Sequence, residues 1–134
     1  EKYATFYFGV YEDQQTTLTY TNAGHLPPIL VRSGNTESLE VTGTVVGAFP
    51  SVRYEERQIK LLSGDLLVGY TDGITEPENE YGEMFGEDRL KELLVRHSRE
   101  DSREIIARVM EAVEQWTGSS ELQDHMTMLV ARRI

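Results

Sequence analysis

The sequence contains no cysteine, which excludes disulfides, thiolate zinc sites and cysteine nucleophiles together. No apolar run approaches the roughly twenty residues that a membrane-spanning helix needs. No basic segment followed by an apolar one opens the chain, as it would in a secretory leader. We therefore expect a cytoplasmic protein that does not associate with membranes.

Basic residues are also few, with 13 Lys and Arg against 23 Asp and Glu, so the formal net charge is −10. This balance argues against nucleic acid or an anionic membrane as the main partner, because both require a basic surface. It suits a protein that gathers carboxylates around divalent cations. A length of 134 residues predicts a single domain, and the 39% hydrophobic share is typical of a folded one.

Strand signals fill the first half of the chain. Residues 4–11 are aromatic and β-branched, and residues 16–21 alternate in the manner of a returning strand, so the two predict a hairpin. Two prolines then interrupt regular structure. Further strands are predicted at residues 29–31, 38–41, 54–62 and 66–68.

Helical signals come later, after an ordered surface loop at residues 77–86. Apolar spacing predicts a helix that starts near Gly86 or Glu87, and a second one that runs from the capping pair Asp101 and Glu104 to Trp116. A last strand is predicted at residues 125–132. Strands, then helices, then one strand indicate an α+β fold with a largely antiparallel sheet.

Two aspartates stand at predicted strand ends. Asp72 follows the apolar strand within residues 64–76, GDLLVGYTDGITE, and Asp124 precedes the last apolar run in residues 123–127, QDHMT. Asp-Gly by itself is also the favoured pair of a tight hairpin turn, so that alternative stays open for Asp72. Two such carboxylates on separate strands are what a hard, oxygen-liganded metal ion would need.

Three motifs follow one another along the chain. They are NAGHLPP at residues 22–28, GD with YTDGITE at residues 64–76, and QDHMT at residues 123–127. Together they resemble the metal-dependent protein phosphatases of the SpoIIE/RsbU type, in the PPM superfamily. GEMFG at residues 82–86 matches the stretch of that family that leads from a flap into a helix. The resemblance extends from about Phe6 to Arg133.

The resemblance implies a largely antiparallel β-sandwich flanked by helices. It also implies hydrolysis of phosphoserine or phosphothreonine by a water activated between two Mn²⁺ or Mg²⁺ ions, so that no side chain acts as the nucleophile. Asp72 and Asp124 match metal-ligand positions of the family. Gly73 is expected beside the metal, where a larger residue would crowd the site. His125, also metal-adjacent, departs from the family, which usually carries Asp there.

A second departure concerns the family's first metal motif, whose aspartate bridges both ions. Nothing in this sequence matches it, because Glu12 and Asp13 fall in a hairpin turn. We therefore expect residues 1–134 to be the C-terminal portion of a catalytic domain. Such a chain should be nearly inactive alone, and it should form a homodimer because its aromatic N-terminal strand lacks neighbours.

The family also implies partners that the residues do not reveal. Its usual substrate is a phosphorylated regulatory protein of the STAS type, an anti-anti-sigma factor, and its catalytic domain usually follows a sensor or receiver domain. A rival hypothesis is a degenerate phosphatase fold that binds a regulatory partner without catalysis. An unrelated β-rich ligand-binding domain would explain the strands but not the three motifs.

Other polar residues carry competing interpretations. His25 could lie near the substrate phosphate, could bind a metal, or could simply hydrogen-bond backbone in its loop. His97 fits a helix face and is interpreted as structural. Glu76 and Glu78 are either solvated charges of the flap or outer contacts of a metal.

Overall fold

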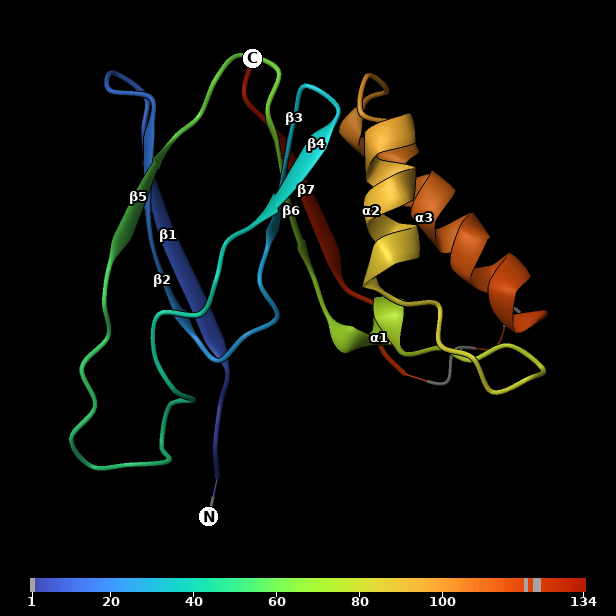
Figure 1. The fold of residues 1–134 in the computed structure, drawn as a ribbon, viewed down its shortest axis with the longest axis horizontal. Helices are drawn as coiled ribbons and strands as arrows, with labels where there is room; N and C mark the ends of the chain where they lie inside the picture. Colours follow the sequence, from blue (N-terminus) through green and yellow to red (C-terminus); the bar gives the residue numbers. More distant parts are fainter. Residues whose placement is uncertain (1, 120, 122–123) are drawn as a thin grey trace.

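The computed structural model describes residues 2–119, 121 and 124–134, and over these residues the chain forms two sheets and three helices (Figure 1). The strands are β1 (Phe6–Glu12), β2 (Thr17–Ala23), β3 (Ile29–Arg32), β4 (Asn35–Ser38), β5 (Arg57–Lys60), β6 (Leu66–Tyr70) and β7 (Met128–Arg132). The helices are α1 (Asp72–Thr75), α2 (Glu87–Arg96) and α3 (Ser102–Thr117).

The two sheets have the strand orders β1-β2-β5 and β4-β3-β6-β7, and every pairing between named strands is antiparallel. In Figure 1 the sheets stand side by side, and α2 and α3 cover the far face of the four-stranded sheet. The predicted α+β fold, an antiparallel sandwich flanked by helices, is confirmed. Both long helices lie on one side.

The two central strands of the four-stranded sheet, β3 and β6, are covered on both faces, which explains their continuous apolar runs. Side chains of a strand alternate between faces, so Ile29 and Val31 join the core beneath the helices whereas Leu30 joins the core between the sheets. Leu18 and Tyr20 meet Leu30 from the three-stranded sheet. β3 therefore links the two cores, and its three apolar residues are all buried.

Local signals position both long helices. Asp101 accepts a hydrogen bond from the Glu104 backbone amide at 2.8 Å, which confirms the predicted cap of α3. The apolar stripe of α3 turns Ile105, Val109 and Val113 into the core. In the part of the chain that the structure describes, no helix is both long enough and apolar enough to cross a bilayer.

The strand predicted at residues 38–41 was placed too late in the chain, since β4 covers Asn35–Ser38. The cause is a two-residue turn in which Ser33 and Gly34 both adopt positive φ, 49° and 77°. This turn places Asn35 directly opposite Arg32 and starts the strand three residues early. The strands predicted at residues 54–62 and 125–132 are correct in place but shorter, as β5 and β7.

β1 forms an edge of its sheet and is paired only with β2 among the described strands. Its outward residues Phe6, Phe8 and Val10 are 53%, 56% and 54% exposed, whereas Tyr7 points inward and stacks on Tyr20 at 5.6 Å between ring centroids. We call Phe6, Phe8 and Val10 the outer face of β1. Burial raises the pKa of Tyr7 to about 12.

An ion pair between the half-buried Arg32 and the buried Asp65 joins the end of β3 to the turn before β6. Asp65, 4% exposed, accepts hydrogen bonds from the Arg32 guanidinium, the shortest at 2.6 Å from Nη2, and one from the Leu62 backbone amide at 2.7 Å. The hydrogen bonding to Asp65 raises the pKa of Arg32 above its usual value. The pair fixes the turn before β6 against the end of β3.

We predict that Asp65→Asn lowers the free energy of unfolding by about 1–3 kcal/mol, because the buried Asp65 position then carries no charge to match the half-buried Arg32 guanidinium. Urea denaturation followed by circular dichroism measures this. Glu56→Gln is the matched control, since the exposed Glu56 side chain makes no hydrogen bond or ion pair within the described residues. Equal stability of the two variants would contradict the structural role of the pair.

Candidate functional site

The end of β6 and the start of β7 are held together beyond the regular strand pairing. Tyr70 is opposite Met128 in the ladder. One step further, the Thr71 amide donates to the Thr127 carbonyl at 3.1 Å, and the Thr127 amide donates to the Thr71 hydroxyl at 3.1 Å. Asp72 follows Thr71, and Asp124 precedes Thr127 by three residues. Both predicted ligands therefore lie at the same end of the sheet, where β6 ends and β7 begins.

Asp72 is the first residue of α1, a single helical turn whose Ile74 is fully buried. The alternative in which Asp72 and Gly73 form a hairpin turn is therefore wrong. Asp72 itself is exposed. The Asp124 side chain is 57% exposed, and its Oδ1 accepts a hydrogen bond from the His125 amide at 2.7 Å. Both carboxylates face solvent, where a cation could reach them.

Gly73 is required by the close passage of the segment before β7. A Cβ atom at Gly73 would overlap the carbonyl oxygen of His125 and lie 2.9 Å from its carbonyl carbon. Because these are backbone atoms, they could not rotate away as a side chain could. The absence of a side chain at Gly73 thus lets the segment that carries Asp124 approach α1.

A hollow of about 400 Å³ lies beside these residues. Its lining comprises Gly73, Asp124, Glu76, Pro77, Glu78 and Met84. Glu76 and Glu78 are exposed and bring two further carboxylates to its rim. Within the described residues, no group of three or more His, Asp or Glu side chains is close enough together to hold a metal ion.

His25 lies at the same end of the sheet as Asp72, because Ile29 and Val68 are opposite each other in β3 and β6. Its Nδ1 lies 2.9 Å from the Leu26 carbonyl oxygen, and its amide donates to the Asn22 side chain at 2.9 Å. These contacts fit the interpretation of His25 as a loop residue that hydrogen-bonds backbone. A role at the substrate phosphate stays a prediction.

Asn22 is the buried residue that organises this loop, and its role was not predicted from the sequence. It is 0% exposed, its Nδ2 donates to the Leu39 carbonyl, and its backbone amide donates to the Thr42 hydroxyl at 2.9 Å. Asparagine before a Gly-containing loop is the signal that could have identified it.

The other two histidines take simple positions. His97 follows α2 and its Nδ1 lies 3.0 Å from Glu100 Oε1, as expected of a structural residue. This contact lowers the pKa of Glu100, with a smaller contribution from Arg108. The His125 ring is fully exposed, with its Nδ1 3.9 Å from the Asp124 carboxylate.

A cluster around Trp116 holds the loop at residues 77–86, and it was predicted only as helix packing. The Trp116 indole donates to the Glu83 carbonyl at 2.8 Å, and the Arg89 guanidinium lies 3.9 Å from the Trp116 ring centroid. Arg89 also donates to the Phe85 carbonyl at 2.9 Å. Because Glu78 and Met84 of this loop line the hollow, α2 and α3 determine the shape of its wall.

Known proteins resemble this chain over its whole length. The family model of Stage II sporulation protein E (SpoIIE) matches residues 1–134. The chain belongs to the SpoIIE family. Among curated proteins, it is 28% identical over 133 residues to the phosphoserine phosphatase RsbU of Bacillus subtilis, covering 98% of this chain and 39% of RsbU. It is 39% identical over 93 residues to protein IcfG of a Synechocystis species, covering 69% of this chain and 15% of IcfG.

Solved structures have the same fold. The SiaA-PP2C domain of Pseudomonas aeruginosa superposes with a TM-score of 0.78 at 20% identity, over 89% of this chain and 47% of that domain. The phosphatase domain of SpoIIE from Bacillus subtilis, Mn presoaked, superposes with a TM-score of 0.73 at 24% identity, over 96% of this chain and 56% of that one. The chain thus spans about half the length of these two solved chains.

We predict that Gly73→Ala in this SpoIIE-family chain lowers the free energy of unfolding by about 1–3 kcal/mol and weakens Mn²⁺ binding, because the added methyl group displaces the backbone at His125. Denaturation and calorimetric titration with Mn²⁺ measure the two effects. Gly69→Ala is the control, since a Cβ at Gly69, also near the end of β6, would meet nothing within 4 Å. If both variants bind Mn²⁺ like the parent chain, Gly73 does not shape the site.

Proposed function

We propose that this chain supplies part of the active site of a metal-dependent protein serine/threonine phosphatase. The observation that carries the proposal is the pairing of Thr71 with Thr127, which brings Asp72 and Asp124 to one sheet edge in a chain of the SpoIIE family. The similarity to RsbU, a phosphoserine phosphatase, supports phosphoserine or phosphothreonine as the substrate group.

Asp72 and Asp124 are the residues that would hold divalent cations here. Carboxylate oxygens that face water suit Mn²⁺ and Mg²⁺, which keep several waters in their shells. When bound, a pair of such ions supplies Lewis-acid polarisation of the phosphoryl oxygens and lowers the pKa of a bound water. The Mn-presoaked SpoIIE structure supports this choice of metal.

The charge of the hollow makes cations necessary for this substrate. Its ionisable lining residues are Asp124, Glu76 and Glu78, and no Lys or Arg of the described residues belongs to the lining. A phosphorylated side chain would be repelled by these carboxylates, because like charges at short range oppose binding. Gly73 lets the Asp124 segment lie close to α1, and the loop clamped by Arg89 and Trp116 limits access from one side.

We further propose that residues 1–134 are the C-terminal portion of the catalytic domain. Support comes from the span of about half of the similar solved chains, and from the finding that no three ligand side chains among the described residues come together closely enough to hold a metal ion. The remaining portion would supply the bridging carboxylate. We place the parent protein in the cytoplasm, with a sensor or receiver domain before the catalytic domain and a phosphorylated STAS-type regulator as substrate.

A second candidate function is a phosphatase-like module that binds a regulatory partner without hydrolysis. The observation that favours it is the same shortage of ligands within the described residues. The two candidates differ in turnover. Metal-dependent release of phosphate by the parent protein supports the phosphatase, and binding of the phosphoprotein without release supports the module.

In a protein that joins this chain to the rest of the domain, we predict that Asp72→Asn or Asp124→Asn lowers Mn²⁺-dependent hydrolysis of a phosphoserine peptide by on the order of 100-fold, because ligand loss costs at least as much as loss of a supporting contact. Asp13→Asn is the control. Asp13 lies in the turn between β1 and β2, outside the candidate site, so this variant should retain activity. The isolated 134 residues should be nearly inactive. Robust turnover by them alone would contradict the proposed division of the site.

We also predict that the isolated chain forms a homodimer through β1. The edge strand offers unpaired backbone groups, and its outer face exposes Phe6, Phe8 and Val10. Light scattering after size exclusion at micromolar concentration tests this. Phe8→Ser should shift the chain toward monomer, whereas the exposed Tyr81→Ser, in the loop before α2, should not. If the unmodified 134-residue chain is monomeric, the prediction is wrong.

A further inference from the structure

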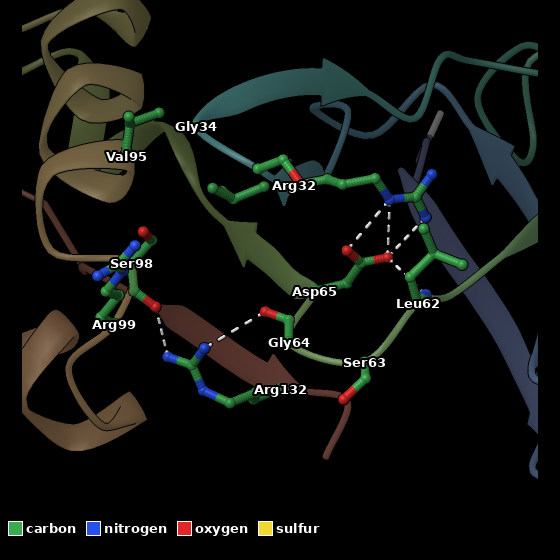
Figure 2. Close-up of a pocket in the computed structure, with 12 residues that line it drawn as sticks. Arg32, Gly34, Leu62, Ser63, Gly64, Asp65, Val95, Ser98, Arg99 and Arg132 are labelled. Carbon is green, nitrogen blue, oxygen red and sulfur yellow. Dashed lines mark hydrogen bonds and ion pairs between the residues drawn. The ribbon is translucent and has the colours of Figure 1, made fainter.

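A second hollow, of about 480 Å³, lies away from the candidate metal site. Four segments build it: the β3–β4 turn, the turn before β6, the connection from α2 to α3, and β7 (Figure 2). Its polar side chains are Arg32, Arg99, Arg132, Asp65, Ser33, Ser63 and Ser98. The lining thus contains three guanidinium groups and one carboxylate, in a chain whose net charge is −10.

Asp65 cannot neutralise this surplus of positive charge. Its Oδ1 accepts from Arg32, and its Oδ2 accepts from Arg32 and from the Leu62 amide, as the dashed lines of Figure 2 show. Its charge is therefore matched by that of Arg32 alone. The charges of Arg99 and Arg132 remain.

Arg132 is held in place by carbonyl groups. Its Nη2 donates to the carbonyl oxygens of Ser98 and Glu100 at 2.6 Å, and its Nη1 donates to that of Gly64 at 3.3 Å. No carboxylate pairs with it among the described residues. Its positive charge is thus fixed at the wall of the hollow without a counter-ion from this part of the chain.

Arg99 is exposed and makes no hydrogen bond or ion pair with any described residue. The hydroxyl groups of Ser33, Ser63 and Ser98 likewise have no partner in the described part of the chain. The hollow therefore combines a free guanidinium, three free hydroxyl donors and a fixed guanidinium. Guanidinium and hydroxyl groups together are the usual donors to phosphate oxygens.

We propose that this hollow binds a phosphate dianion, either free or as a small phosphomonoester. The positive charge and free donors would meet the phosphoryl oxygens, with Arg99 closing over them from the α2–α3 connection. Val31, Leu62 and Val95 form an apolar part of the lining, against which the carbon side of an ester could pack. A monoester should therefore bind more tightly than free phosphate.

The site is distinct from the one proposed for catalysis. Asp65 precedes β6 and Asp72 follows it, so the two hollows lie at opposite ends of one strand, roughly 20 Å apart at about 3.3 Å per residue. Binding here requires no metal. The proposal therefore stands or fails independently of the phosphatase activity.

The test is calorimetric titration of the 134-residue chain with inorganic phosphate and with phenyl phosphate, a monoester with an apolar carbon side, in EDTA and at physiological ionic strength, where screening removes weak long-range attraction. Both probes should bind, the ester more tightly. Arg99→Gln should weaken binding roughly tenfold, the effect of one charge-assisted hydrogen bond, and Arg99→Lys should recover part of it. Arg103→Gln, the same charge change at an exposed residue on α3 outside the hollow, should leave the affinity unchanged.

A nitrogen–proton correlation spectrum provides a second measurement, in which phosphate should shift the amides of Ser63, Gly64, Ser98 and Arg99. The proposal is overturned if neither probe binds, or if Arg99→Gln and Arg103→Gln weaken binding equally, which would indicate general charge attraction. It is also overturned if the shifted amides lie elsewhere. Tighter binding of free phosphate than of phenyl phosphate would overturn the proposed packing of the ester on the apolar lining.

Discussion

The candidate site depends on the antiparallel pairing of β6 with β7. These strands are separated in the sequence by the whole helical segment, and their ladder ends at Tyr70 and Met128. The hydrogen bonds between Thr71 and Thr127 extend it by one step, in the direction of the two aspartates. Because backbone pairing aligns strands more precisely than a loop could, two distant carboxylates reach one edge.

That pairing is in turn stabilised by burial on both faces of the central strands β3 and β6. Val68 is fully buried beneath α2 and α3, and Leu30 of the neighbouring strand packs toward the other sheet. The Arg32–Asp65 pair holds the start of β6. An error in register of one residue would reverse every side chain of the strand, so both cores oppose it.

The two ends of β6 differ in electrostatic character. Beyond the end at Asp72 lies a hollow lined by Gly73 and Asp124, and among the described residues its charged lining consists of carboxylates, which suits cations. The end at Asp65 borders a hollow with three arginines, whose surplus of positive charge suits an anion. The net charge of −10 does not reveal this difference between the two ends. Acidic and basic residues that are distant in the sequence gather into separate regions only when the chain folds.

Local patterns in the sequence determined many of the strands and helices and indicated the family. The alternation of Leu18 and Tyr20, the capping pair at α3 and the apolar strand before Asp72 are local patterns, and local backbone preferences are enough to express them. The order of three motifs likewise indicated the family, which the match over residues 1–134 confirmed. Asp72, Asp124, Gly73 and His125 were named from these motifs.

Only the tertiary structure decided how those residues meet. The contact of Gly73 with the His125 backbone, the hydrogen bond from Trp116 to Glu83, and the gathering of Arg32, Arg99 and Arg132 all join segments far apart in the chain. The position of β4 was also predicted wrongly from the sequence, because the turn with positive φ at Ser33 and Gly34 sets where this strand begins. Periodicity records which face a residue occupies, but it does not record which distant element packs on that face.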